Sequence, residues 1–300
     1  MKLTVSMIVK NEESCLEKCL ESVKDADEII IVDTGSTDKT IEIAKKYTDK
    51  VYSGKEYLWQ DNFAFSRNQS LEKCTGDWVY IIDADEYIEK NGIKKIRNFI
   101  TKGTNNKAYM VKHYDASSKN FSHNSVRLFK RTPTVKWNGA IHNYLNVVSA
   151  DILNLKHYVG YSEAHKKDPN RALRILKKQV SNNPDCTREK FYLAREYYYR
   201  RDWKTAIHYY TWYLETAYFG PEIVDAHMMI CYCYAGIGNM KKAREHCLKC
   251  IDMNTNHKEA LEYMSKISGP GNSKRWKEWS KTATNEGLLF VRSLTFKEMK

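Results

Sequence analysis

Two short apolar segments that are each followed by an aspartate constrain the fold of this chain most. Ile29–Val32 and Trp78–Ile82 are strand-sized, and the residues after them are Asp33 and Asp83. Stretches with helical spacing lie between them, and apolar strands separated by helices predict a parallel sheet that is covered on both faces. Ligands bind such sheets beyond the carboxyl ends of the strands, where we expect both aspartates.

Other segments extend this pattern over about half of the chain. Thr4–Val9 is a further short apolar run, and residues 107–160 hold several stretches rich in aromatic and β-branched residues with weak helical signals. We therefore predict an α/β domain over residues 1–160. Its sheet is expected to be Rossmann-like and mostly parallel, with residues 107–160 forming a mixed edge.

From about Asn170 the pattern becomes helical and repeats. Five positions recur 37 residues later, so that Ala194, Tyr197, Ala206, Tyr210 and Tyr213 correspond to Cys231, Tyr234, Ala243, Cys247 and Cys250. Ala172 precedes Ala206 by 34 positions. This period, with small residues where paired helices touch, resembles the tetratricopeptide repeat. We predict all-α helical repeats over residues 161–268 and a basic, tryptophan-containing tail over residues 269–300.

Composition narrows the class of protein. With 42% hydrophobic and 29% charged residues, the chain is typical of a soluble globular protein. No apolar run approaches the roughly 18 residues of a membrane span, and Glu12 is too early an acidic residue for a signal peptide, so a cytoplasmic location is expected. Eight cysteines do not suggest a disulfide framework. Because several of them occupy small-residue positions of the repeat, buried thiols are favoured over a zinc site.

The net charge of +12 lies mostly in the C-terminal half. Such an excess fits a solvated helical surface, and it would also suit an acidic acceptor, an anionic lipid or nucleic acid. Tryptophans among lysines in the tail add to the nucleic-acid interpretation, which we rank last, behind a capping segment on the repeats.

The strongest candidate site is the pair Asp83 and Asp85, two residues apart at the end of the strand Trp78–Ile82. Unpaired carboxylates are costly to bury, so a divalent cation with oxygen ligands, Mg²⁺ or Mn²⁺, is the natural partner. An ordinary acidic surface turn is the alternative.

Two further segments support a site at this edge. Gly35 permits a tight turn directly after Asp33, and this places the carboxylate to accept hydrogen bonds from a base or a ribose. Arg67 opens a helix before the next strand and can pair with phosphate or hold an aspartate. The alternatives are an Asx turn at Asp33 and a surface cation at Arg67.

Taken together, these elements resemble the GT-A glycosyltransferases of the family 2 type. The matching elements, in order, are MIVKNEE, DEIIIVDTGSTDKT, SRNQSL and GDWVYIIDADEYI, and the resemblance covers residues 3–160. Two later segments, SVRLFKRTPTVKWNGAIHNYL and LKHYVGYSEAHKKDPNRALRIL, resemble a bacterial-type subgroup in which a tetratricopeptide array follows the transferase.

The resemblance implies a nucleotide-sugar donor, most often a UDP-sugar, with UDP-glucose favoured. Asn11, Glu12 and Asp33 would lie by the uridine, and Arg67 would steady the diphosphate. The acceptor would be a glycan, a peptide or a lipid-linked sugar. The repeats would recognise that acceptor, bind a protein partner or form a homodimer.

The resemblance also implies a metal site. Asp85 would bind Mn²⁺ or Mg²⁺ at the diphosphate, and Asp83 would contact the ribose or the metal. A metal neutralises the leaving diphosphate as an oxocarbenium-like centre forms, and family members invert the anomeric configuration. His142 and His157 are candidates for a late metal ligand, and each is otherwise a structural histidine.

The chain departs from the family pattern at the position expected for the general base. The related subgroup usually has Glu directly after the first histidine, whereas this chain has Asn143, which cannot act as a base. Glu86 and Asp115 remain the base candidates. The departure at Asn143 also motivates a second hypothesis, in which a degenerate transferase domain serves a repeat-containing interaction protein.

Overall fold

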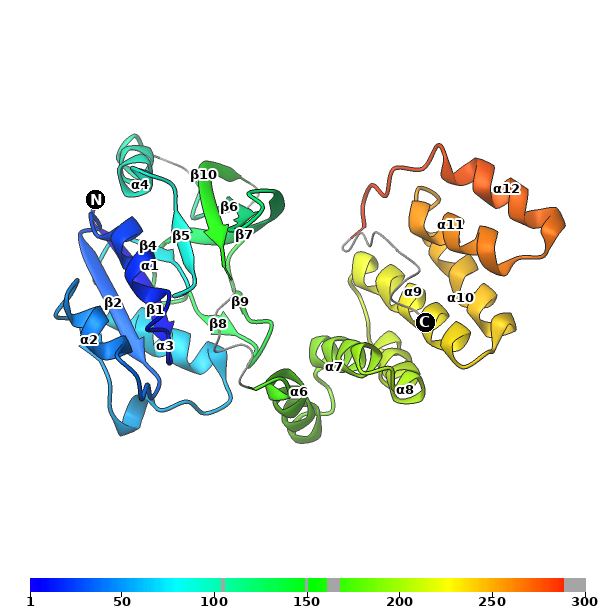
Figure 1. Ribbon diagram of the computed structural model, residues 1–300, viewed down its shortest axis with the longest axis horizontal. Helices are drawn as coiled ribbons and strands as arrows, with labels where there is room; N and C mark the ends of the chain where they lie inside the picture. The colour runs from blue at the N-terminus through cyan, green and yellow to red at the C-terminus, as the bar shows by residue number, and fades with distance from the viewer. Residues whose placement is uncertain (104–105, 149–150, 161–167, 289–300) are drawn as a thin grey trace. The chain divides into compact units, whose positions relative to one another are not determined.

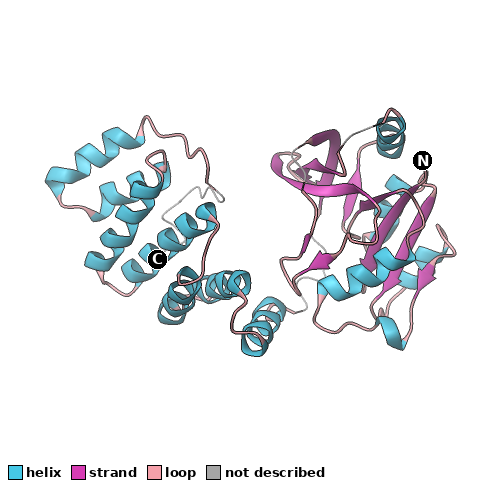
Figure 2. Ribbon diagram, turned by 180° about the vertical axis from the view of Figure 1, so that it is seen from behind, coloured by secondary structure: helices cyan, strands magenta, loops and turns pink. Residues whose placement is uncertain are grey.

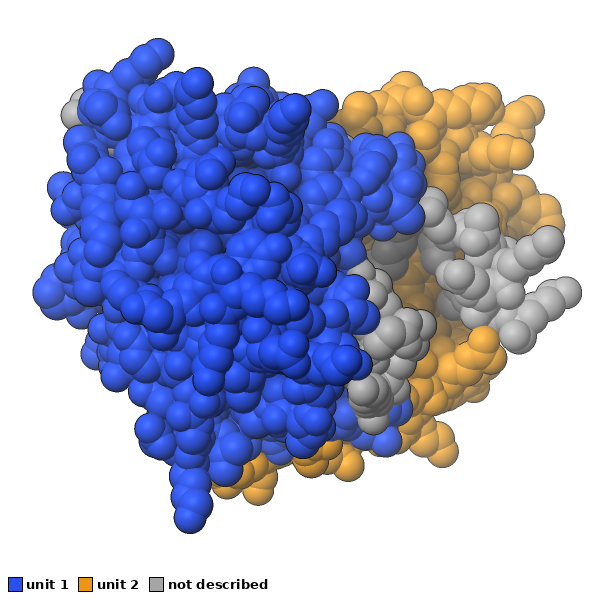
Figure 3. Space-filling model, turned by 60° about the vertical axis from the view of Figure 1, so that its left-hand side comes forward, with its two compact units in different colours: residues 1–171 blue, residues 172–300 orange. Residues whose placement is uncertain are grey.

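The computed structural model describes residues 1–103, 106–148, 151–160 and 168–288 (Figure 1). The chain divides into two compact units, residues 1–171 and residues 172–300, which Figure 3 distinguishes by colour. Each unit is described by itself below. Among the described residues, no helix has both the length and the apolar character that crossing a membrane requires.

The first unit is built on an eight-stranded sheet. Its strands, in the spatial order of the sheet, are β3 (Val51–Tyr52), β2 (Glu28–Asp33), β1 (Leu3–Val9), β4 (Trp78–Ile81), β7 (Phe121–Lys130), β6 (Ala108–Asp115), β10 (Ile152–Val159) and β5 (Glu86–Ile88). A separate ribbon pairs β8 (Trp137–Asn138) with β9 (Tyr144–Leu145). The helices are α1 (Leu16–Val23), α2 (Thr40–Lys45), α3 (Phe63–Lys73) and α4 (Gly92–Thr101), with a 3-10 turn η1 (Lys55–Tyr57).

The strand order reverses at β1. β1 pairs in parallel with β2 on one side and with β4 on the other, so the chain leaves the sheet centre in one direction and returns to the opposite side. Of the described strand pairs of this sheet, four are parallel and three are antiparallel, and the antiparallel pairs all involve β5 or β7. The predicted α/β sheet with a mixed edge over residues 107–160 is therefore confirmed.

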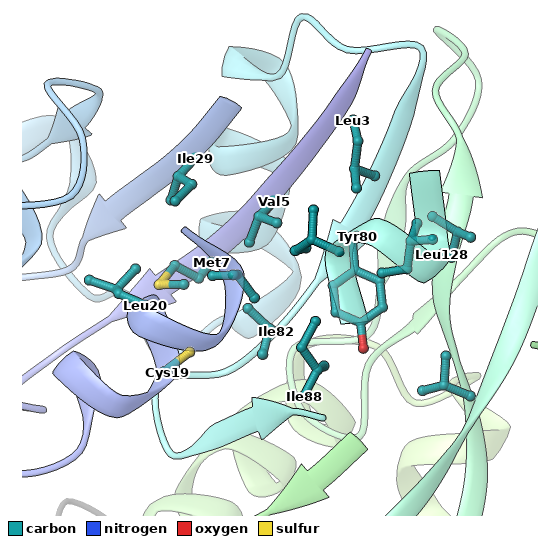
Figure 4. Close-up of a cluster of buried hydrophobic side chains, with 14 of the residues drawn as sticks. Leu3, Val5, Met7, Cys19, Leu20, Ile29, Tyr80, Ile82, Ile88 and Leu128 are labelled. Atoms are coloured by element: carbon teal, nitrogen blue, oxygen red, sulfur yellow. The ribbon is translucent and has the colours of Figure 1, made fainter. Parts of the chain in front are cut away.

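Both faces of the central strands are covered, which explains why their sequences are apolar without interruption. Tyr80 and Ile82 join one buried cluster with residues of β1, α1 and α4, whereas Val79 and Ile81 join a second cluster with Ala64 of α3. Figure 4 shows side chains of β1, α1 and β4 meeting in the first cluster. Alternate residues of one strand thus serve opposite faces.

In the part that the structure describes, up to residue 288, the second unit contains helices and no strand, as Figure 2 shows by colour. Its helices are α6 (Arg171–Asn182, whose first residue belongs to the first unit), α7 (Thr187–Tyr199), α8 (Trp203–Leu214), α9 (Gly220–Gly236), α10 (Met240–Met253), α11 (Lys258–Ile267) and α12 (Pro270–Ser280). An α/β domain followed by an all-α region was expected, and this fold class is confirmed.

Equivalent positions of two helix pairs share their local structure at the predicted spacing. Asp202 caps α8 by accepting a hydrogen bond from the Thr205 N–H, and Asn239, 37 positions later, caps α10 in the same way. The residues before these caps, Arg201 and Gly238, both have positive φ. The small residues predicted at helix contacts are fully buried, among them Ala194, Ala206, Cys231, Ala243, Cys247 and Cys250. The tetratricopeptide assignment remains a prediction.

The predicted domain limits also remain predictions. The limit at residues 160–161 adjoins residues 161–167, which lie outside the described residues, whereas the compact units divide after Arg171. The predicted tail over residues 269–300 contains α12, and its last part, residues 289–300, is not described.

Candidate functional site

The predicted site residues that follow β2 and β4 lie at one edge of the sheet. Val9 is in register with Asp33, and Ser6 is in register with Ile81, so the carboxyl ends of the parallel strands β2, β1 and β4 point to the same edge, with β4 ending three residues before β1. Asp83 follows β4 by two residues. This edge coincides with the reversal of strand order at β1, which is where open α/β sheets bind their ligands.

Asp33 organises the turn after β2. Its side chain is buried, and Oδ2 accepts hydrogen bonds from the main-chain N–H groups of Gly35 and Ser36, each at 3.0 Å. Gly35 has φ +104°, a conformation that disfavours side chains, and an added Cβ would lie 3.0 Å from Leu58. The turn after β2 is therefore an Asx turn formed by the Asp33 side chain, and its backbone conformation requires glycine at position 35.

The loop after β1 is joined to this turn by reciprocal hydrogen bonds. The Asn11 N–H donates to Ser36 Oγ at 2.9 Å, and the Thr37 N–H donates to Asn11 Oδ1 at 2.8 Å. The Glu12 N–H donates to the Thr40 hydroxyl at 2.7 Å. The structure thus brings the residues predicted near the base, Asn11, Glu12 and Asp33, into one pair of connected loops.

Asp83 is held between two arginines. Arg67 Nη2 of α3 lies 2.6 Å from Oδ1, and Arg127 Nη1 of β7 lies 3.5 Å from Oδ2. Burial alone would raise the pKa of Asp83, but the two guanidinium groups outweigh burial and hold that pKa below its ordinary value. Arg67 was expected near an aspartate, whereas the sequence gave no sign of Arg127 beyond its place in a strand.

The Arg67 side chain is itself held in place. Its guanidinium carbon lies 4.9 Å from the centre of the Trp137 ring. The Asn68 side-chain amide fixes the main chain of Trp137, because it accepts a hydrogen bond from the main-chain N–H at 2.8 Å and donates one to the main-chain carbonyl at 3.0 Å. Asn62 caps α3 by accepting from the Phe65 N–H, so both the helix start and the arginine are anchored.

Glu86 faces the interior of the first unit. Its side chain is 3% exposed, Oε1 accepts from Arg127 Nη2 at 2.7 Å, and Oε2 accepts from the Asp83 N–H at 2.8 Å. His157 Nε2 lies 2.9 Å from Oε2, within ion-pair distance but off the line of a hydrogen bond. The other ring nitrogen of His157 lies 2.7 Å from the Tyr80 hydroxyl. A base candidate and a metal-ligand candidate therefore meet in one buried network.

Asp85 lies in the turn between these groups. Its side chain is partly exposed, and its carbonyl oxygen accepts a hydrogen bond from the Gly160 N–H at 3.0 Å. A Cβ at Gly160 would clash with that carbonyl, so the close approach of the two backbones requires glycine. Asp85 thus combines a fixed main chain with a side chain that solvent reaches.

The remaining predicted residues, His142 and Asp115, lie in other segments of the first unit. His142 is exposed in the loop between β8 and β9, with φ +49°. Asp115 ends β6, and Oδ1 accepts hydrogen bonds from the Ser117 hydroxyl at 2.6 Å and the Ser118 N–H at 2.6 Å. These bonds, with that of Ser117 first, hold the pKa of Asp115 below its ordinary value.

A buried group of possible metal ligands was not predicted as a set. One ligand atom each from Glu86, His113 and His157 lies within 4.8 Å of the other two, and all three side chains are buried. Burial, followed by the charge of Arg127, lowers the pKa of His113 to about 2. His113 stacks on His123 with ring centres 4.6 Å apart. His113 could be placed in a strand from sequence, but its neighbours could not.

The N-terminal half matches one known family. Residues 4–150 match the model for Glycosyl transferase family 2. The chain is 29% identical over 206 residues to the SPbeta prophage-derived glycosyltransferase SunS of Bacillus subtilis, a match that covers 65% of this chain and 49% of that protein. It is 31% identical over 147 residues to a TPR repeat-containing protein of Synechococcus elongatus, covering 48% and 36%. The chain thus spans half or less of the length of these curated relatives.

Solved structures give a more distant comparison. Staphylococcus aureus TarS 1-349, crystallised with UDP-GlcNAc, aligns with 94% of this chain and 92% of that chain at 14% identity and a TM-score of 0.45. A similarity this low carries no inference about ligands.

Proposed function

We propose that this chain, whose residues 4–150 form a glycosyl transferase family 2 domain, is a metal-dependent, inverting glycosyltransferase that uses a UDP-sugar. The observation that carries the proposal is the sheet edge at the reversal of strand order. There the Asp33 turn and the turn over residues 83–86 stand on either side of β1. Open α/β sheets bind their ligands at an edge of this kind, and two groups of polar atoms there suit a nucleotide and its diphosphate.

The loops after β1 and β2 are proposed to receive the uridine. The Asp33 carboxylate is buried and already fixed by two main-chain N–H groups, so it presents its remaining acceptor positions without reorganisation. Asn11 and Glu12 are tied to the same turn and complete the pocket in this proposal. UDP-glucose remains the favoured donor, on the strength of the family resemblance alone.

The residues of the second turn are proposed to hold the diphosphate and its cation. Bound Mn²⁺ or Mg²⁺ would neutralise charge on the leaving diphosphate. Asp85 is the first choice of ligand because the residue is partly exposed and carboxylate oxygens suit a hard cation, and the exposed His142 is the second. Asp83 and His157 remain further candidates; Asp83 is paired with Arg67, and the buried His157 lies against the Tyr80 hydroxyl. Arg67 is proposed to steady the diphosphate from α3.

The deprotonation of the acceptor is the open step. Glu86 is buried and bonded to Arg127, so an acceptor hydroxyl cannot reach it in this arrangement. Asp115 is exposed, but its hydrogen bonds lower its pKa and weaken it as a base. Together with Asn143, this favours a second candidate function, a degenerate transferase domain within a repeat-containing interaction protein. The acceptor, whether glycan, peptide or lipid-linked sugar, and a partner bound through the repeats remain proposals.

Release of nucleotide from a panel of nucleotide sugars, with Mn²⁺ or with EDTA, tests the proposal. A metal ion at a leaving diphosphate contributes several kcal/mol, so Asp85→Ala or EDTA should lower release at least about 100-fold. Asp49→Ala changes an exposed aspartate beyond α2 and is the matched control. Release that ignores both the metal and Asp85→Ala would refute the metal assignment. Absence of nucleotide binding by the wild type would favour the interaction protein.

A further inference from the structure

The groups around Asp83 and Glu86 balance their charges through contacts within the protein. Arg127 bridges the two carboxylates, at 3.5 Å from Asp83 and 2.7 Å from Glu86, and Arg67 pairs with the other oxygen of Asp83 at 2.6 Å. The Arg127 and Glu86 side chains are 14% and 3% exposed, so solvent screens this pair weakly. Two carboxylates thus face two guanidinium groups.

The same contacts argue against a metal ion at Glu86, His113 and His157. Oε1 of Glu86 is bonded to Arg127, and Oε2 accepts the Asp83 N–H and lies against His157. A divalent ion on this carboxylate would sit beside the guanidinium of Arg127, and like charges in a buried site repel strongly. The geometry therefore fits an ion-pair network of protein groups better than a metal centre. We call the pair Glu86 and Arg127, with their contacts to Asp83, the clamp.

The clamp holds both ends of the turn that contains Asp85. The Glu86 side chain accepts the Asp83 N–H at 2.8 Å, and the Glu86 N–H donates to the Asp83 carbonyl at 3.0 Å. The chain from Asp83 to Glu86 is therefore tied at both ends by one residue. Behind Glu86, His157 of β10 is fixed by the Tyr80 hydroxyl of β4. Strands β4, β7 and β10 all contribute to holding one four-residue turn.

We propose that Glu86 and Arg127 are positioning residues, which act through the turn over residues 83–86 to aim Asp85 at the donor. The inference rests on the proposed function for the identity of that donor. Groups that hydrogen-bond to a metal ligand and orient it typically contribute about 10- to 100-fold in affinity or activity, so an effect of that size is expected.

The test compares three variants with a matched control. Glu86→Gln keeps the shape of the side chain but removes its charge, Arg127→Met removes the guanidinium, and the double variant removes both. Arg131→Met is the control, because Arg131 follows β7 and donates to the Gly76 carbonyl rather than to a carboxylate. Mn²⁺-dependent binding of UDP, kcat and KM for nucleotide release, melting temperature and hydrogen exchange of the peptide over residues 79–90 are measured for each.

Both single variants should lower Mn²⁺-dependent UDP affinity roughly 10- to 100-fold, and the double variant should lose no more than the worse single variant, because one clamp is broken in each case. Exchange over residues 79–90 should rise in all three without ligand, while Arg131→Met leaves exchange and affinity at wild-type values. Losses that multiply in the double variant, or unchanged exchange, would overturn the proposal.

Two further results separate this inference from the proposed function. If the wild type binds no nucleotide but exchange still rises in the variants, the clamp stands and the transferase function fails. Elemental analysis is the other check. One equivalent of a metal ion that is retained by the wild type and lost in His113→Ala would make the cluster a metal centre and overturn the clamp.

Discussion

Carboxylates that are partly or fully shielded from solvent have different partners in the two units. In the α/β unit, Asp83 lies against Arg67 and Arg127, and its pKa is lowered. In the helical unit, Glu222 accepts a hydrogen bond from the Tyr213 hydroxyl at 3.2 Å, and burial raises its pKa although Arg188 lies 3.4 Å away. Two guanidinium groups, one of them at 2.6 Å, outweigh burial at Asp83, whereas the guanidinium of Arg188 at 3.4 Å and the Tyr213 hydroxyl do not outweigh burial at Glu222. The ion pairs of Asp83 suit a site that binds charged groups, whereas the contacts of Glu222 suit packing between helices.

The largest expected effect tests whether the packing of buried side chains supplies most of the stability of the helical unit. Phe191 is fully buried and lies 5.2 Å from the Tyr213 ring and 5.9 Å from the Tyr210 ring, measured between ring centres. Phe191→Ala should lower the free energy of unfolding of this unit by about 3–5 kcal/mol. Calorimetry should show one transition shifted, with UDP binding unchanged. Loss of UDP binding in the folded variant would contradict the division of roles.

The next effect concerns acid stability. Glu28 is buried and accepts hydrogen bonds from Lys50, Thr4 and Thr75, which outweigh burial and lower its pKa. A lowered folded-state pKa gives stability that is present above the unfolded-state pKa and lost as the pH falls toward the folded-state value. Glu28→Gln should therefore cost about 2 kcal/mol at pH 7 and less in acid.

Glu222 should show the opposite sign, because its pKa is raised in the folded state. Its contribution to stability falls as the pH rises above the unfolded-state value. Urea unfolding between pH 2 and pH 7, followed for wild type, Glu28→Gln and Glu222→Gln, measures how the free energy of unfolding changes with pH in each case. If the free energy of unfolding depends on pH in the same way in both variants, Glu28 and Glu222 do not differ in the sign of their pKa shifts.

A smaller effect on UDP affinity is expected when two aspartates that accept main-chain hydrogen bonds are compared. Asp33 accepts from Gly35 and Ser36 at the proposed uridine site, and Asp202 accepts from the Thr205 N–H at 3.2 Å to cap α8. Asp33→Asn removes a charged acceptor and should weaken UDP binding about 10-fold. Asp202→Asn, the matched change in the helical unit, should leave titration calorimetry with UDP unchanged. Similar losses in both variants would mean that Asp33 acts through stability alone.

The smallest expected effect compares two helix caps. Asn62 begins α3, the helix that carries Arg67, and Asn239 begins α10. Replacement of either by Ala should cost about 1 kcal/mol of stability. Only Asn62→Ala should also weaken UDP binding, because it loosens the start of the helix that carries Arg67. Equal UDP affinity in the two variants, measured by titration, would count against a role for α3 at the diphosphate.

Local patterns in the sequence were enough to predict the framework of the site. The apolar strands before Asp33 and Asp83 identified the sheet and the edge at which both lie, because strands buried on both faces have no polar alternation. Gly35 identified the tight turn because few other residues adopt its φ. The spacing of small residues in the helical region also depends only on local periodicity, and those residues are buried.

The sequence by itself thus determined the strands, the turns and the edge at which they meet, since each depends on neighbours within a few residues. Only the tertiary structure decided the partners of the buried charges. Arg127 reaches Asp83 and Glu86 because β7 pairs with β4 in antiparallel register, a contact between residues some 50 positions apart. His157 reaches Glu86 because β10 pairs with β5. No local pattern specifies which strand becomes the neighbour, so the role of Glu86 could not be read from its position after Asp85.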